Sequence, residues 1–140
     1  MKRPTLIFTG SWRASIDPDR FALIGISRSA PRGRVGYRKY AALQPGNWFR
    51  SIPDAAAWTT RYNDEVLGRL DPEKVVADLA AMAGDQPAVL LCWELPPPNR
   101  EWCHRALVSQ WLHKAMGLEV PELGFEGCGH GSEHPKLPPK

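Results

Sequence analysis

The stretch Ala88-Val89-Leu90-Leu91-Cys92 decides the fold class of this 140-residue chain. Five apolar residues in a row, after the turn-forming Gly84-Asp85-Gln86-Pro87, predict a strand that is buried on both faces, as the strands of parallel sheets are. Two further short apolar runs, at residues 5–9 and 21–26, predict additional strands. Residues 118–121 are expected to add a short final strand.

Three helices are predicted between and after these strands. Asp71, followed by proline, is the expected N-cap of the middle helix. A variant capping box, Ser51-x-x-Asp54, predicts an earlier helix, and Asn99 is the expected N-cap of the last one. The apolar stripes that would face the core are Ala56, Trp58, Tyr62, Val66 and Leu70, then Val75, Val76, Leu79, Ala80 and Ala83, then Leu107, Val108, Trp111, Leu112 and Ala115. Strands alternating with helices predict a small α/β domain, with a mostly parallel sheet in two or three layers and helices packed on it.

Length and composition predict one domain at residues 1–123 and a flexible, polar, Gly- and Pro-rich tail at residues 124–140. The net charge is +3, and the three cysteines do not follow the spacing of a disulfide framework. No apolar stretch reaches the core of a signal peptide or the roughly 18 residues of a membrane span. A cytoplasmic protein with reduced thiols and no membrane partner is therefore predicted.

The strongest chemical motif is Cys92-Trp93-Glu94 followed by Cys103-His104-Arg105. Glu94 lies just beyond the carboxyl end of a predicted parallel strand, which is the edge where α/β sheets bind ligands. Cys103 and His104 lie one turn before the apolar stripe of the last helix, so they are expected on its core-facing side. Arg105 lies about 100° further around the helix and is expected to reach the pocket rim.

A helix N-terminus favours anions, and the same field favours the thiolate form of Cys103. Glu94 could then act as a general base, or hold His104 or a substrate N–H group. We predict that Cys92, Glu94, Cys103, His104 and Arg105 form one catalytic site. The plainer alternatives are that the cysteines are small core residues, that Glu94 is a surface carboxylate, and that His104 and Arg105 pair with it structurally.

The same residues carry a resemblance to a family. The strings Val89-Leu90-Leu91-Cys92-Trp93-Glu94, Cys103-His104-Arg105-Ala106-Leu107 and Gly117-Leu118-Glu119-Val120-Pro121-Glu122 resemble the bacterial and phage family called domain of unknown function 488. Upstream, Ile26-Ser27-Arg28-Ser29-Ala30-Pro31-Arg32, Tyr40, Leu43 and Pro45 resemble one branch of it. The Pro-rich gap and the Cys/His tail depart from the family pattern. The resemblance implies that the five motif residues act together, and it names no substrate.

A basic loop at residues 27–50 is the second feature. It contains six basic residues and no acidic one, and Tyr37, Tyr40, Trp48 and Phe49 are interleaved with them. Basic groups for phosphate and rings for base stacking are typical of contacts with nucleotides or single-stranded nucleic acid. The residues predicted to bind substrate are Ser27, Arg28, Arg32 and Tyr40. The alternative is a solvated loop whose aromatic side chains pack onto the core.

The tail contains Cys128, His130 and His134, whose side chains are of types that bind zinc. Cys92, Cys103 or His104 could supply the fourth ligand of a tetrahedral site. The spacing matches no strong zinc pattern, so no cofactor or metal is predicted, and the three side chains are expected to be unstructured.

Two functional hypotheses follow. The first is an enzyme that acts on a nucleotide, a nucleic acid or another phosphorylated, anionic compound. The second is a non-catalytic module that binds nucleic acid or protein through the basic loop. The sequence contains no P-loop, GxGxxG, GxSxG or HExxH motif, so Walker-type ATP hydrolysis, dinucleotide oxidoreduction and serine hydrolysis lack support.

Overall fold

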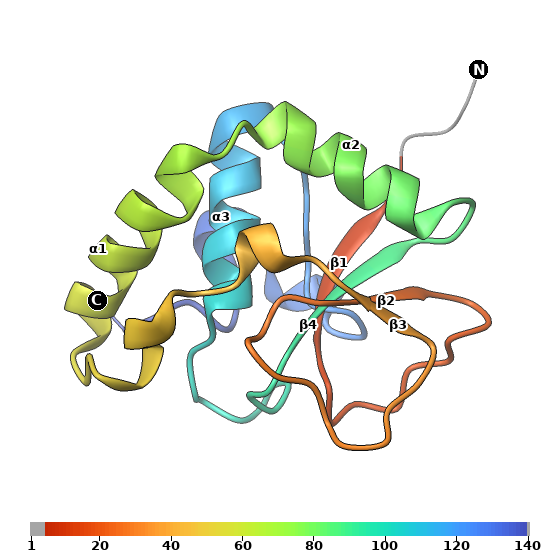
Figure 1. The fold of residues 1–140 in the computed structure, drawn as a ribbon, viewed down its shortest axis with the longest axis horizontal. Coiled ribbons are helices and arrows are strands. Elements are labelled where there is room, and N and C mark those ends of the chain that lie inside the picture. The colour runs from red at the N-terminus through yellow and green to blue at the C-terminus, as the bar shows by residue number, and fades with distance from the viewer. Residues whose placement is uncertain (1–4, 140) are drawn as a thin grey trace.

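The structure, a computed structural model, describes residues 5–139. Within them a four-stranded sheet runs in the order β1-β4-β2-β3, and every pairing is parallel. The strands are β1 (Ile7–Ser11), β2 (Ala22–Gly25), β3 (Tyr37–Lys39) and β4 (Ala88–Cys92). The last strand of the chain is thus inserted between the first two (Figure 1). The α/β prediction is confirmed.

The central place of β4 follows from its composition, because all five of its residues are buried. Its side chains alternate between two cores. Ala88 and Leu90 belong to the larger core under the helices, whereas Val89 and Leu91 pack with Trp12 in a smaller core on the opposite face. A strand with apolar side chains on both faces has no solvent side, so it takes a middle position in the sheet.

The three helices lie on one side of the sheet (Figure 1). They are α1 (Ala55–Glu65), α2 (Pro72–Ala83) and α3 (His104–Met116). Leu79 from α2 and Leu107 from α3 belong to the same core as Leu90 of β4. The opposite face of the sheet is covered by loops instead, so the fold has two layers of regular elements.

Side chains cap the first two helices, and one of the two starts agrees with the sequence. Asp71 accepts a hydrogen bond from the backbone N–H of Glu73 and caps α2, as predicted. The first helix begins later than the capping box suggested, because Asp54 itself is the N-cap and accepts from Ala57.

The start of the last helix was predicted wrongly at Asn99. The side chain of Asn99 accepts from the backbone N–H of Glu101 in a local turn, and the N-cap of α3 is Cys103. The predicted strand at residues 118–121 reduces to one bridge between Thr9 and Glu122. The loop at residues 27–50 contains β3 and two short 3-10 helices, so it has more structure than predicted.

The expectation of an unstructured tail was also wrong. The backbone N–H of Gly131 donates to Ser109 Oγ at 3.1 Å, and the carbonyl of Lys136 accepts from the N–H of Cys103 at 2.9 Å. His134 and Lys136 are buried. Residues 124–139 therefore pack onto α3 and the loop before it. The apolar content of this segment is low, and hydrogen bonds to buried polar groups anchor it instead.

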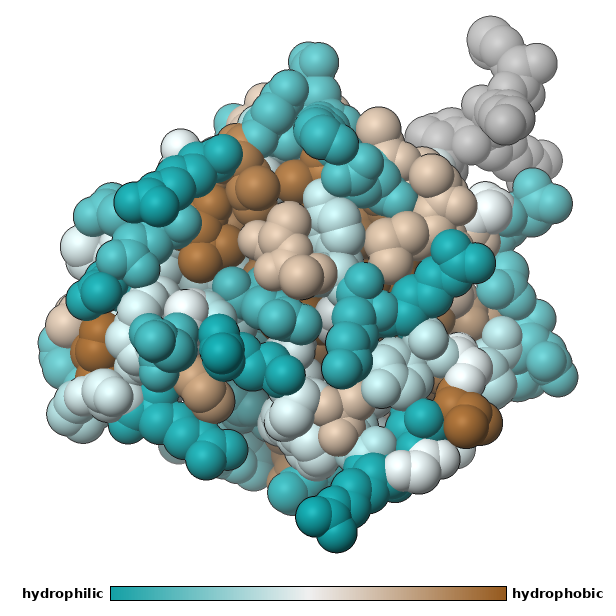
Figure 2. All heavy atoms as spheres, in the orientation of Figure 1, coloured by the Kyte–Doolittle hydropathy of each residue, from teal (hydrophilic) through white to brown (hydrophobic). Residues whose placement is uncertain are grey.

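Hydrophilic side chains are spread over the face shown in Figure 2, and apolar side chains appear in separate patches between them. None of the helices within residues 5–139 is long and apolar enough to cross a membrane. This face offers no broad apolar surface.

Replacing Gly131 tests how the tail is anchored. A Cβ there would lie 2.8 Å from Cγ of His113, and the φ angle of Gly131 is +59°. We expect Gly131→Val to lower the free energy of unfolding by roughly 1–3 kcal/mol and to raise hydrogen exchange over residues 124–139. The matched control is Gly127→Ala, where a Cβ meets no atom within 4 Å. Equal exchange in both variants would contradict the docked tail.

Candidate functional site

A pocket of about 670 Å³ opens at the carboxyl edge of the sheet. Arg13 follows β1, Ser27 follows β2, and Cys92 ends β4, and all three line this pocket. Parallel strands bring their carboxyl ends to one edge, which explains why segments far apart in the chain meet here. His104, at the start of α3, closes the pocket from the helix side.

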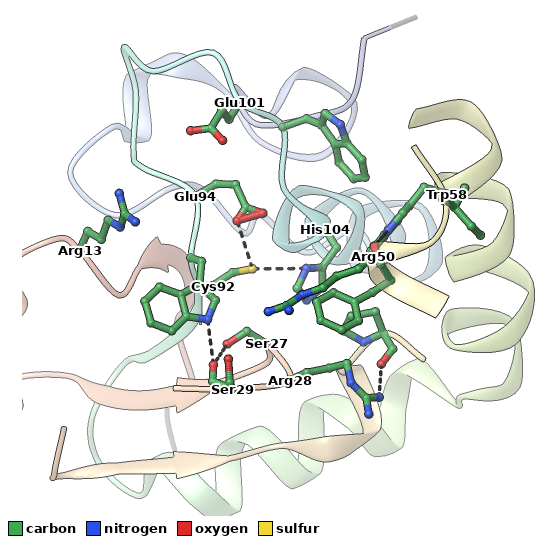
Figure 3. Close-up of a pocket in the computed structure, with 15 residues that line it drawn as sticks. Arg13, Ser27, Arg28, Ser29, Arg50, Trp58, Cys92, Glu94, Glu101 and His104 are labelled. Atoms are coloured by element: carbon green, nitrogen blue, oxygen red, sulfur yellow. Dashed lines mark hydrogen bonds between the residues drawn. The ribbon is translucent and has the colours of Figure 1, made fainter. Parts of the chain in front are cut away.

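The floor of the pocket is a cluster of sulfur, imidazole and carboxylate groups. Cys92 Sγ lies 3.4 Å from His104 Nδ1 and 4.0 Å from Glu94 Oε2. Cys103 Sγ lies 4.0 Å from the same His104 nitrogen. Figure 3 shows the Cys92 sulfur between the Glu94 carboxylate and the His104 ring. The two halves of the sequence motif therefore meet in space.

The proton of the His104 ring can be assigned from its hydrogen bonds. Nε2 lies 3.0 Å from the carbonyl oxygen of Ile26, which only accepts, so Nε2 carries the proton. Nδ1 is then free to accept, and it faces the two sulfur atoms. The ring is held in place by Tyr62 and Trp58, with ring centroids 5.3 and 6.0 Å away.

The surroundings act in opposite directions on the two thiols. Burial opposes ionisation of Cys103, yet the neighbouring Cys92 thiol and the Arg105 guanidinium hold its pKa below the usual range. Burial and the charge of Cys103 raise the pKa of Cys92. The N-cap position of Cys103 adds the positive end of the α3 dipole. The surroundings therefore favour ionisation of Cys103 over ionisation of Cys92.

Glu94 lies at the edge of this cluster, half-buried and lining the pocket. Burial, and next the nearby charge of Cys103, raise the pKa of its carboxyl group to about 7. A carboxyl group with this pKa exchanges protons near neutral pH, as a general acid or base must.

The prediction that Arg105 reaches the pocket rim was wrong. Its side chain has no exposed surface, and it forms an ion pair with Glu122 at 2.7 Å. Its Nη1 donates to the backbone carbonyl of Glu94 at 3.0 Å. Arg105 therefore positions the Glu94 backbone, and it cannot hold a substrate anion from this place.

A buried network behind Arg105 was not predicted as a unit. Thr9 Oγ1 donates to Glu122 Oε1 at 2.7 Å and lies 2.7 Å from His134 Nε2. The backbone N–H of Lys136 donates to His134 Nδ1 at 3.0 Å, so Nε2 carries the proton toward Thr9. In the sequence, Glu122 stood out only as the last residue of the segment that resembles the family. Nothing in the sequence indicated that this carboxylate is buried, so its pairing with Arg105 could not be predicted.

The predicted substrate-binding residues divide into two groups. Ser27 and Arg28 line the pocket. Arg32 is exposed and does not line it. Tyr40 also lies outside it, because its hydroxyl donates to Asp78 Oδ2 at 2.7 Å on α2.

Further basic and aromatic side chains line the pocket. The guanidinium groups of Arg28 and Arg50 lie 5.7 and 5.1 Å from the centre of the Phe49 ring, so one ring holds both at the rim. Arg13 is a third arginine on the pocket wall. The sequence signal for Arg50 was its place in the basic loop, and for Arg13 its place after the first strand.

The zinc ligand set expected as an alternative in the tail is not assembled. Cys128 is exposed, His134 is buried in the network with Thr9, and the His130 ring packs on His113. Within residues 5–139, the group of three ligand-type side chains that does come together is Cys92, Cys103 and His104.

No protein-family model, no curated protein and no solved structure matches this chain.

Breaking the buried ion pair should strongly destabilise the protein. Glu122→Gln leaves the Arg105 guanidinium without a counter-charge, and we expect a loss of about 3–5 kcal/mol in the free energy of unfolding, measured by urea denaturation. Lys74→Gln, which removes the exposed Lys74–Asp78 pair, should cost less than about 1 kcal/mol. Similar losses in the two variants would show that burial of the pair is not decisive.

Acid should destabilise the protein through His134. Burial lowers its pKa in the fold to about 4, against 6.5 for an unperturbed histidine; Arg105 and Lys136 act in the same direction, and Glu122 opposes them. Between these values His134 binds more protons in the unfolded chain, so its contribution to the free energy of unfolding falls as pH drops from 6.5 to 4, by up to about 3 kcal/mol. Glu94, whose pKa is raised in the fold, contributes with the opposite sign, so the His134 contribution is read from the difference between parent and variant.

His134→Gln is the test of this pH dependence. The variant is expected to be less stable than the parent at pH 8 but to lose less on acidification, as followed by chemical denaturation at each pH. An unchanged slope between pH 6.5 and 4 would rule out His134 as the group that titrates.

Proposed function

We propose that the protein is an enzyme that acts on an anionic substrate, of the nucleotide or phosphorylated class, with the cluster around Cys92 as its reaction centre. The observation that carries this proposal is the convergence, in one pocket, of that cluster with three arginine side chains. Cys92, Glu94 and His104 line the pocket and can touch a substrate. Cys103 and Arg105, which are fully buried, act through these neighbours.

The charges of the pocket are divided between two sides. Arg28 and Arg50 lie at one end, Glu94 and Glu101 lie at the other, and Arg13 lies apart from the other two arginines, nearer to Glu94 (Figure 3). Guanidinium groups bind phosphate or carboxylate through charge-assisted hydrogen bonds, and carboxylates accept from N–H and O–H groups. This division favours a substrate with an anionic group at one end and hydrogen-bond donors at the other, as in a nucleotide.

Indole rings supply the remaining walls. Trp93 and Trp102 both line the pocket beside the carboxylates. Trp93 is held by a 3.0 Å hydrogen bond from its ring N–H to the Ser29 carbonyl, and Trp102 by edge-on packing against Trp58 with centroids 5.0 Å apart. Fixed aromatic walls suit a planar base, because stacking is strong and tolerant of which base is bound.

The binding-module alternative receives less support. Tyr37 packs edge-on against Trp12 with centroids 5.1 Å apart, and Trp48 is buried with its ring N–H on Glu65. The Tyr40 hydroxyl donates a hydrogen bond to Asp78 on α2. Three of the four rings of the basic loop are thus engaged within the fold, which leaves Phe49 as the ring at the pocket.

The family resemblance is also supported, because Cys92 and Glu94 lie close to Cys103 and His104. We therefore include membership of the domain of unknown function 488 family in this proposal. The spacing Cys-x-Glu and Cys-His-Arg then has a physical meaning. The first pair supplies the strand end, and the second supplies the first turn of the facing helix.

Binding of the anion is tested by titrating nucleoside monophosphates, sugar phosphates and short single-stranded oligonucleotides into the purified protein. We expect one of these classes to bind, and Arg13→Ala together with Arg50→Ala to weaken it by at least about tenfold. Arg20→Ala, which removes an exposed arginine outside the pocket, should leave the affinity unchanged. Equal loss with Arg20→Ala would indicate a general charge effect.

Catalysis is tested on the compound that binds. Glu94→Gln keeps the size of the side chain, and we expect it to lower kcat by about 10²–10⁴ while the affinity stays within a few-fold. Product is followed by chromatography and mass spectrometry. Binding of single-stranded nucleic acid without any turnover, unchanged in the Glu94→Gln variant, would contradict the enzyme and support the binding module.

A further inference from the structure

We propose that Cys92, Cys103 and His104 bind a zinc ion whose fourth coordination position opens into the pocket. The proposal deepens the proposed function, on which the catalytic role of the metal rests. Metal binding itself is measurable without any substrate.

The sulfur–nitrogen distances are close to those of a tetrahedral zinc site, and the third donor pair lies within reach of the same ion. All of them lie within 4.8 Å of one another. Zinc–sulfur bonds of about 2.3 Å and zinc–nitrogen bonds of about 2.0–2.1 Å give tetrahedral edges of about 3.6 Å from sulfur to nitrogen and about 3.8 Å between sulfurs. The distances from His104 Nδ1 to Cys92 Sγ and Cys103 Sγ, 3.4 and 4.0 Å, lie on either side of the expected sulfur–nitrogen edge.

His104 is prepared as a ligand. Its Nε2–H donates to the carbonyl of Ile26, and its unprotonated Nδ1 faces both sulfurs. Zinc-bound histidines typically make this second hydrogen bond to a carbonyl or carboxylate, which fixes the ring and raises its basicity. The rings of Tyr62 and Trp58 pack on the imidazole and limit its rotation.

The charge and softness of the donors select the metal. Two thiolates and one imidazole suit zinc far better than magnesium or calcium, which take oxygen ligands. Two thiolates also neutralise a divalent ion, and the nearby guanidinium of Arg105 is already paired with Glu122. The bound site would therefore be close to neutral, as a largely buried group must be.

The position of the pocket distinguishes this site from a purely structural one. Cys92 and His104 line the pocket, whereas Cys103 is buried behind them. Three protein ligands with one open position are typical of catalytic zinc. Glu94 lies beside the open side, with Oε2 4.0 Å from the Cys92 sulfur.

This arrangement gives the carboxylate a defined role in hydrolysis of a phosphate ester. A water at the open position would lose a proton to Glu94, and its oxygen would attack phosphorus. The bond from phosphorus to the leaving oxygen would break, and Glu94 would return the proton to that oxygen. The arginines of the rim would bind the charged oxygens of the phosphate.

Elemental analysis of the untagged full-length protein, expressed with added zinc, is the first test. We expect close to one zinc per chain. Titration of the metal-free protein with Co²⁺ should give the visible absorption of a tetrahedral cobalt–thiolate site. Cys103→Ser is the diagnostic variant, because serine is a preferred N-cap and should let α3 form, while zinc content falls at least about tenfold. Circular dichroism checks its fold.

Two controls separate the metal site from other effects. Cys128→Ser removes the exposed cysteine, and Glu94→Gln changes the neighbour that is not a ligand; both should keep zinc. Zinc retained by Cys103→Ser would overturn the proposal. So would a folded protein that binds neither Zn²⁺ nor Co²⁺, or a mass lower by two hydrogen atoms that marks a Cys92–Cys103 disulfide. If substrate turnover persists after complete removal of metal, the proposed function holds and zinc has no part in it. If zinc binds and no substrate is turned over, the metal site holds and the proposed function fails.

Discussion

The ion pair between Arg105 and Glu122 is the constraint on which the arrangement of this protein depends. Removing two full charges from water costs several kcal/mol each, so such a pair is tolerated only where further hydrogen bonds complete it. Here the guanidinium makes two bonds to the carboxylate, at 2.9 and 2.7 Å, and a third to the Glu94 carbonyl. Thr9 donates to the carboxylate from the other side.

These bonds join segments that are far apart in the chain. Thr9 comes from β1, Glu94 from the end of β4 and Arg105 from the first turn of α3. The helix start is thereby held against the middle of β1 and the carboxyl end of β4. Cys103 is the N-cap of that helix and His104 is its first residue, so the same hydrogen bonds fix where both side chains lie relative to Cys92. His134 attaches the tail to the same network through Thr9.

The pocket combines a largely dry floor with a polar rim. Cys92, Cys103 and His104 are buried, whereas Arg13, Arg28 and Arg50 are exposed. Electrostatic interactions are strong on the floor, where the surrounding protein has a low dielectric constant, and weaker at the rim. Such a division suits a site that first attracts a charged ligand and then acts on it in an environment with little water.

The sequence by itself determined the elements whose signals are local. The apolar run at residues 88–92 indicated a strand buried on both faces, Asp71 indicated a helix start, and both halves of the Cys-x-Glu and Cys-His-Arg motif were recognised as parts of one site. Each of these depends on neighbours within a few residues, through side-chain alternation, N-capping or spacing. Tertiary structure alone decided the rest. Arg105 turns inward because Glu122, 17 residues later, supplies a buried counter-charge, and the tail is ordered because Thr9 and Ser109 offer it partners more than 20 residues away. No periodicity encodes such long-range polar contacts, since one hydrogen-bonding partner leaves no repeat in the chain.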